Sequence, residues 1–77
     1  MIRLSELKVS EKGKVISVNA KGDLLHRFID LGIIEGTIIK CIGESPQGDP
    51  KAYLIRGARI ALRNRDALLI EVGDIYG

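Results

Sequence analysis

Cysteine and histidine are almost absent from this sequence of 77 residues, which contains one of each and no tryptophan. A lone Cys41 cannot form an intrachain disulfide, and with His26 it supplies too few ligands for a zinc site of cysteines and histidines. No stretch approaches the roughly 18 apolar residues that cross a membrane, and the first residues lack a signal-peptide core. We therefore expect one cytoplasmic domain, residues 1–77, that does not span a membrane, is stabilised by packing and has no tightly bound cofactor.

Aromatic side chains are scarce as well and make up 4% of the chain. Phe28, Tyr53 and Tyr76 are the only ones. Domains that recognise proline-rich peptides need aromatic grooves, and proteins that bind single-stranded nucleic acid need stacking platforms. The sequence therefore argues against both of these functions.

Charge is nearly balanced, with 12 basic and 10 acidic side chains. A net charge of +2 does not by itself indicate a nucleic-acid partner. The basic residues are unevenly placed, however, because the segment 53–65 contains no acid and four arginines, namely Arg56, Arg59, Arg63 and Arg65. Such a run is usually a solvated face, but arginine beside exposed apolar surface is also enriched at protein interfaces. Both interpretations stay open.

Turn residues divide the chain into short segments with alternating or β-branched patterns. Strands are expected at 14–18, 37–42, 52–56, 58–63 and 68–72. A helix is expected over 24–31, with Asp23 as its N-cap and Gly32 just past its end. Single turns are expected at 4–7 and 64–67, and a frayed tail at 73–77.

These segments predict a mainly β fold, a small SH3-like barrel of about five antiparallel strands with one inserted short α-helix. A barrel is favoured because an open sheet of such short strands would leave its edges unpaired. The side chains expected in the core are Leu24, Phe28, Leu31, Tyr53, Ile55, Ile60, Leu62 and Ile70. Alternation along the hairpin then turns the remaining side chains outward, namely Ala52, Leu54, Arg56, Arg59, Ala61 and Arg63.

The stretch CIGESPQGDP, residues 41–50, contains both prolines of the chain. Gly43 to Gly48 match the first half of a phosphate-binding loop, but Asp49 and Pro50 stand where lysine and serine or threonine are required. Asp49 would repel a phosphate, and Pro50 has no N–H to donate. A nucleotide site is thus excluded, and we expect a rigid corner with an exposed tip.

The few groups that could bind a metal or catalyse a reaction do not form a convincing set. His26 and Asp30 lie four residues apart on the polar helix face and are the weak candidates for a surface metal site, although a solvated pair is the simpler interpretation. Cys41 inside an apolar strand is typical of a small core residue. No serine is marked as a nucleophile and nothing supplies an oxyanion hole, so we do not expect an enzyme.

With its segments placed, the chain resembles the family of ferrous iron transport protein A (FeoA). The most specific features of this resemblance are an LGxxxG motif at residues 31–36 and a PxGDP-type loop at residues 46–50, together with the spacing between them. Glu35 and Lys51 depart from the family pattern, which commonly has proline and an apolar residue there. The matching segments are LSELKVSEKGKV (4–15), RFIDLGIIEG (27–36), SPQGDP (45–50) and IALRNRDALLIEV (60–72).

The resemblance implies an accessory role in ferrous iron uptake, as a protein-interaction module on a membrane iron permease that carries a cytosolic G domain. It also associates the family with transition metal ions such as Fe2+ and leaves room for a weak homo-oligomer. The residues expected to bind the partner are Pro46, Gly48, Asp49, Leu54, Arg56, Arg59 and Arg63.

Two other functions use the same arginines. The first is a small nucleic-acid-associated or regulatory barrel, of the kind found at the C-terminus of iron-dependent repressors, with Arg56, Arg59, Arg63 and Arg65 on phosphates. The salt dependence of binding distinguishes it from protein docking. The second is an activator that lends an arginine in trans to a GTPase. Nothing in the sequence singles out which arginine that would be.

Overall fold

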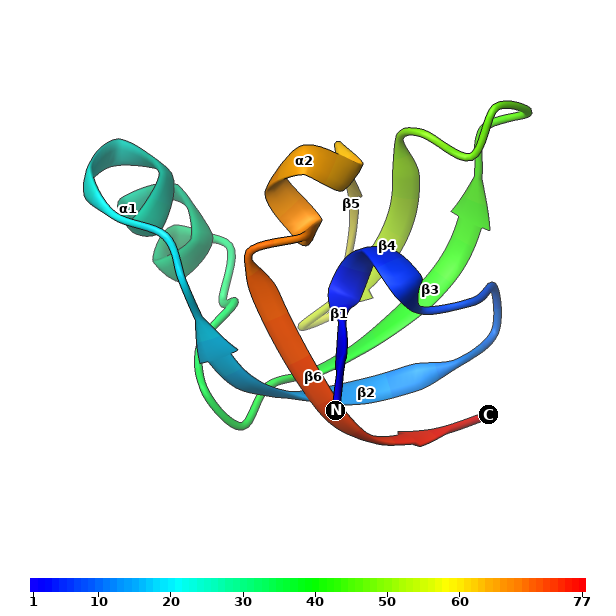
Figure 1. Cartoon of the computed structure of the whole chain (residues 1–77), viewed down its shortest axis with the longest axis horizontal. Coiled ribbons are helices and arrows are strands. Elements are labelled where there is room, and N and C mark those ends of the chain that lie inside the picture. The colour runs from blue at the N-terminus through cyan, green and yellow to red at the C-terminus, as the bar shows by residue number, and fades with distance from the viewer.

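A six-stranded antiparallel sheet is the framework of the computed structural model, which describes residues 1–77. Along the chain the elements are β1 (Ile2–Arg3), the 3-10 turn η1 (Leu4–Glu6), β2 (Lys12–Val18), α1 (Gly22–Asp30), β3 (Ile38–Glu44), β4 (Lys51–Ile55), β5 (Ala58–Leu62), α2 (Asn64–Ala67) and β6 (Ile70–Tyr76). The strands lie in the order β1-β6-β2-β3-β4-β5. Figure 1 shows the sheet curling around a centre, with α1 set to one side. The predicted mainly β, SH3-like barrel is confirmed, and the sixth strand is the two-residue β1.

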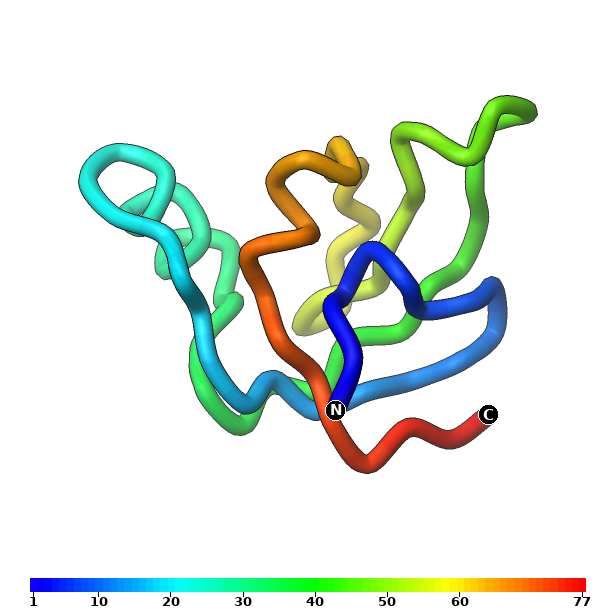
Figure 2. The backbone as a smooth tube through the Cα atoms, in the orientation of Figure 1, coloured from blue at the N-terminus to red at the C-terminus, as the bar shows by residue number.

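The C-terminal segment differs from its predicted form. A frayed tail at 73–77 is wrong for residues 73–76, because β6 continues to Tyr76. Gly73 pairs with Lys14 and Tyr76 with Lys12, with one extra residue of β6 between the two pairs. Asp74, at φ 53°, lies in this bulge, where a positive φ is common. The backbone traced in Figure 2 accordingly ends alongside β2.

Helix α1 ends as the sequence predicts. Gly32 has φ 87°, its N–H donates to Ile29 O, and the N–H of Ile33 donates to Phe28 O. These two bonds are those of a Schellman motif, which ends many helices at a glycine in the left-handed region. At the other end of the helix the N-cap is Lys21 rather than Asp23, so the helix begins two residues earlier than expected, at Gly22.

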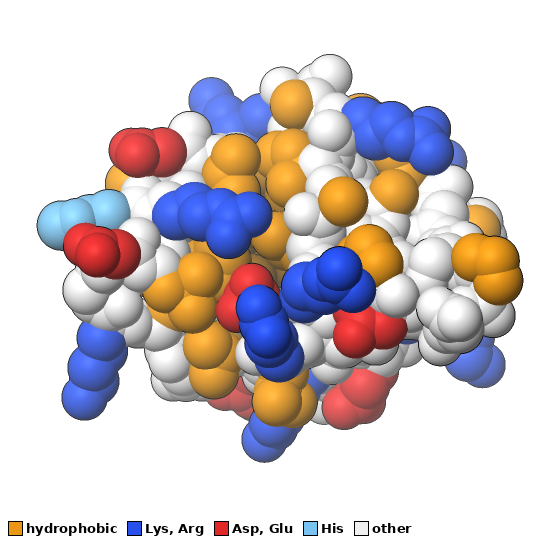
Figure 3. Space-filling view, turned by 90° about the horizontal axis from the view of Figure 1, so that it is seen from above, with side chains coloured by type: hydrophobic (Ala, Val, Ile, Leu, Met, Phe, Trp, Pro, Cys, Tyr) orange, Lys and Arg blue, Asp and Glu red, His pale blue; other side chains and the backbone are white.

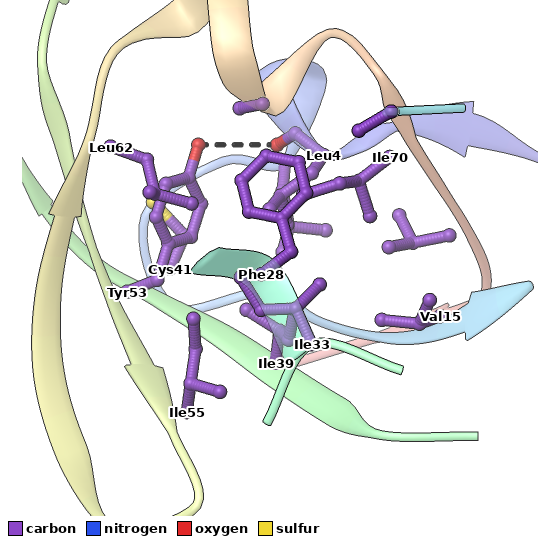
Figure 4. Close-up of a cluster of buried hydrophobic side chains, with 14 residues drawn as sticks. Leu4, Val15, Phe28, Ile33, Ile39, Cys41, Tyr53, Ile55, Leu62 and Ile70 are labelled. Atoms are coloured by element: carbon purple, nitrogen blue, oxygen red, sulfur yellow. Dashed lines mark hydrogen bonds between the residues drawn. The ribbon is translucent and has the colours of Figure 1, made fainter. Parts of the chain in front are cut away.

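The core lies inside the curled sheet and is closed by Phe28 from α1 (Figure 4). Phe28, Leu62 and Ile70 are buried as predicted, and so are Tyr53 and Ile55. The prediction that Leu24, Leu31 and Ile60 are buried is only partly right, because they are half-buried at the margin of this cluster. The reason is that α1 stands beside the barrel (Figure 1), and Phe28 is its one fully buried side chain.

No helix of the structure combines the length and the apolar character needed to cross a membrane, and the longest, α1, has nine residues.

Candidate partner-binding surface

The hairpin of β4 and β5 presents an outer face that combines arginine with exposed apolar surface. Tyr53 pairs with Ile60 and Leu54 with Arg59 across the two strands. Because Tyr53 is fully buried, its neighbour Leu54 points outward and is 40% exposed. Arg59 is exposed on the same face. The alternation in the sequence therefore predicted correctly that Leu54 and Arg59 point outward, whereas Arg56, expected in the first strand, lies in the turn after Ile55.

Arg56 and Gly57 form the two-residue turn of the hairpin, and both have positive φ, 50° and 84°. This conformation is that of a type I′ turn, for which Asn-Gly is the preferred sequence. A long side chain such as arginine is unusual there and costs free energy of folding. Arg56 thus holds a backbone conformation that its residue type disfavours.

The side chain of Arg56 runs across the end of α1. A Cβ built on Gly32 would overlap with Cδ of Arg56, so this glycine leaves the space that the arginine fills. Beside this contact is a hollow of about 570 Å³, lined by Ile29, Asp30, Leu31, Gly32, Ile34, Ile55, Arg56, Ala58 and Ile60. In the view from above, apolar side chains gather next to the helix that carries the single histidine, with basic side chains across them (Figure 3).

Sequence reasoning missed this hollow. Ile29 is 48% and Ile34 46% exposed, although Ile29 lies beside the core residue Phe28 in the predicted helix 24–31. The pattern indicates which side of a helix is apolar, but it cannot tell that the helix will stand off the barrel and leave that side partly uncovered.

None of the arginines has a carboxylate partner. Lys14–Asp74, at 3.8 Å, is the single ion pair of the structure. Arg59 lies over Gly43, because a Cβ built on that glycine would be 4.0 Å from an Nη atom of Arg59. Arg63 is exposed where β5 ends, and Arg65 is exposed on α2. The guanidinium groups of this surface are thus free to pair with groups of another molecule.

The loop after β3 is held to α2. Gly48 N–H donates to Ser45 O, and the Asp49 carboxylate accepts the N–H of Asn64 at 3.0 Å. The Asn64 amide in turn donates to Gly48 O at 3.0 Å. Asp49, expected to bind the partner from this loop, is half-buried instead of exposed: its carboxylate satisfies a free N–H at the start of a helix, where negative charge is favoured. Pro46 is at the exposed part of the loop.

Two residues depart from the pattern of the family that the sequence resembles, and the structure accounts for Lys51 but not for Glu35. Lys51 reaches the turn η1, where its Nζ donates to Ser5 O at 2.7 Å and to Leu7 O at 3.2 Å. The ammonium group of Lys51 therefore has two backbone acceptors. Glu35 is exposed in the turn before β3, and nothing in the structure explains its choice over proline.

The side chains do not form a metal site. His26 and Asp30 are both exposed on α1, and no three His, Cys, Asp or Glu side chains come together so as to hold an ion. Cys41 is fully buried, as predicted for a core residue, and burial raises the pKa of its thiol. A protonated thiol is a poor ligand. The residues present therefore do not fit a resident transition metal.

Comparisons with known proteins all point to the same family. Residues 2–73 match the family model of the FeoA domain. A Fe(2+) transport protein A/Fe(2+) transporter FeoB fusion protein of Porphyromonas gingivalis is 32% identical over 71 residues, which are 92% of this chain and 8% of that protein. The chain thus spans less than a tenth of this curated relative.

Solved structures share the fold. The NMR structure of a FeoA-like protein from Clostridium acetobutylicum has a TM-score of 0.84 and 36% identity, over 94% of this chain and 84% of that chain. The crystal structure of Stenotrophomonas maltophilia FeoA complexed with zinc, described as a prokaryotic SH3 domain protein, has a TM-score of 0.83 and 27% identity, over 95% of this chain and 91% of that chain.

Proposed function

The chain belongs to the FeoA domain family, which has a role in ferrous iron transport, and on this premise we propose that it is a cytoplasmic, non-enzymatic accessory protein of ferrous iron uptake. In this role it docks on a membrane iron permease that carries a G domain, and iron is the cargo of the permease rather than a resident ion of the barrel. In agreement with this proposal, no three His, Cys, Asp or Glu side chains of the chain come together to hold a metal ion.

The observation that carries the proposal is the fusion protein, in which a domain similar to this chain and the FeoB transporter are parts of one polypeptide. Joining two modules in one chain raises their effective concentration for each other. Such fusion is an advantage when the modules bind each other weakly. We infer that the separate chain makes the same kind of contact without the covalent link.

The docking surface is proposed to be the outer face of the hairpin, which we call the arginine face and define as Leu54, Arg56, Arg59 and Arg63. Arginine and a partly exposed aliphatic side chain are the mixture enriched at protein interfaces. Arg56 supports this assignment because it retains a disfavoured φ of 50°, and such local cost is often found where a side chain has a function.

The neighbouring loop completes the proposed surface. Pro46 is exposed and offers a direct contact, whereas Gly48 and Asp49 hold the loop in place through Asn64. The test is charge reversal of Arg59 and Arg63, with binding to the purified permease in detergent as the readout. Unchanged binding would show that the face is only solvated charge.

A further inference from the structure

The outer face of the sheet continues past the hairpin, and lysine replaces arginine there. Strand pairing places Tyr76, Lys12, Lys40, Leu54 and Arg59 in one row across five strands. Neighbouring strands are about 4.8 Å apart, so this row is about 19 Å long when it is followed along the curved sheet. The face is broad, with an arginine part on β4–β5 and a lysine part on β2, β3 and β6.

Lys12 and Lys40 lie directly opposite each other in the ladder of β2 and β3. Like charges at such a position are destabilising. No carboxylate pairs with either lysine, because the single ion pair is Lys14–Asp74. Lys12 Nζ lies instead 5.6 Å from the centroid of the Tyr76 ring. The fold therefore keeps two unneutralised cations side by side, and an external anion would remove that cost.

The two lysines and Arg56 surround a second hollow, of about 320 Å³, whose other lining residues are Ile38, Leu54 and Gly57. Three cationic and no acidic side chains line it. The phosphodiester of a phospholipid headgroup carries one negative charge, so several headgroups presented together would offset these three cations, and lysine binds phosphate as a point charge. The hollow thus favours a surface of clustered phosphates over a single anionic group.

Exposed apolar side chains accompany the lysines. Ile38 is 43% and Tyr76 52% exposed. Tyrosine, with its apolar ring and polar hydroxyl, is enriched where membrane and water meet, and lysine is attracted to anionic lipids. Lysine is depleted at protein interfaces, whereas arginine is enriched there. This difference favours a lipid surface for the lysine part and a protein for the arginine part.

We propose that the lysine face, defined as Lys12, Lys14, Ile38, Lys40 and Tyr76, binds the phosphate headgroups of an anionic phospholipid membrane. The inference goes beyond the proposed docking and rests on it only for the nearness of a membrane. Contact with the bilayer on this side would leave the adjoining arginine face turned toward a protein embedded in the same bilayer.

The test is co-sedimentation of the whole chain with vesicles at low salt. Vesicles of three parts phosphatidylcholine and one part phosphatidylglycerol are expected to bind the protein, and vesicles of phosphatidylcholine alone are not. Each lysine near an anionic surface contributes about 1 kcal/mol, so Lys12→Gln with Lys40→Gln should lower the partition coefficient about 30-fold. The bound fraction should also fall as salt is added.

The matched control is Lys8→Gln with Lys21→Gln, which changes the net charge equally at two exposed lysines outside the strands. It should keep most of the binding. Loss of binding equal to that of the first variant would overturn the proposal, because binding would then follow net charge. Failure of the parent to bind anionic vesicles would overturn it as well, even if inorganic phosphate or duplex DNA bound the lysines. These vesicles contain no permease, so either result leaves the proposed docking untouched, and docking is measured without vesicles.

Discussion

Arg56 lies across Gly32, so that the turn of the β4–β5 hairpin and the end of α1 meet at these two residues. Both have positive φ, 50° and 87°, and the arginine side chain occupies the space that a Cβ on Gly32 would need. Glycine is thus required at position 32 for two reasons. The backbone at the helix end has a positive φ, and the side chain of Arg56 packs where a Cβ would be. This contact also sets the hairpin turn beside the hollow at α1.

Replacing Gly32 with alanine should lower the free energy of unfolding by about 2 kcal/mol or more. About 1–2 kcal/mol comes from the left-handed backbone, and the rest from overlap with Arg56. Gly36→Ala is the matched control, because Gly36 has φ 92° but nothing within 4 Å of its Cβ position. In an Arg56→Ala background the Gly32→Ala cost should fall to that of Gly36→Ala. Equal costs in both backgrounds, measured by urea unfolding, would contradict the contact.

Phe28 is the one side chain of α1 that enters the core completely. Phe28→Ala should destabilise the domain by about 3 kcal/mol or more, because truncating a buried aromatic leaves a cavity. This loss is a large part of the stability of a small domain. Ile29→Ala, on the exposed side of the same helix, should cost far less. A melting temperature of Phe28→Ala equal to that of the parent would contradict the docking of the helix on the barrel.

Much of this arrangement could be predicted from local sequence. Alternation placed Tyr53 inside and Leu54 outside, and the LG pair marked the end of α1, because both signals depend on neighbours a few residues away. The strand at 73–76 was missed since Gly73 and Asp74 are typical of turns, and only pairing with Lys14 makes them part of a sheet. The role of Asp49 was missed for a similar reason, because its partner Asn64 is 15 residues away.

Tyr53 should make stability depend on alkaline pH. Burial raises the pKa of its hydroxyl above the ordinary value near 10, and the hydroxyl donates to Leu4 O at 3.3 Å. The folded state therefore keeps this proton after the unfolded chain has lost it. The stabilisation is complete below pH of about 10, the value for an unfolded tyrosine, and is lost as pH rises above it.

Tyr53→Phe should flatten the decline of unfolding free energy between about pH 10 and 12. At neutral pH it should cost only about 0.5–1.5 kcal/mol, since Leu4 O keeps the N–H of Leu7 as a donor. Chemical unfolding at a series of pH values measures both effects. A decline of the same steepness in parent and variant would mean that Tyr53 ionises alike in the folded and unfolded chain.

Removal of metal should leave the fold unchanged. Because no three potential ligands come together, no coordination sphere has to form during folding, as it does in a structural zinc site. Thermal melting with and without a strong chelator should therefore give the same midpoint. Weak zinc binding at His26 and Asp30 is compatible with this result and should disappear in His26→Ala. Unfolding on chelation would show that the ligands of a structural site had been misidentified.

The arginine face should matter to binding far more than to folding. Arg59 and Arg63 are exposed, and substitutions at such positions typically change stability by no more than about 0.5 kcal/mol. Truncating arginine at the centre of an interface commonly costs about 2 kcal/mol or more, which corresponds to roughly 30-fold in affinity. Arg59→Glu with Arg63→Glu should therefore keep the melting temperature and lose at least that much affinity for the permease in detergent.

The control for charge alone is Lys8→Glu with Lys21→Glu, which adds the same negative charge away from the hairpin and should bind nearly as well as the parent. Equal affinity of the arginine variant and the parent would show that this face is solvated and that docking occurs elsewhere. Duplex DNA separates the remaining alternative. Four phosphate contacts through Arg56, Arg59, Arg63 and Arg65 would give a slope of about −3.6 in log affinity against log salt. Such a slope, lost in the arginine variant while permease binding stayed intact, would assign these side chains to nucleic acid instead of the permease.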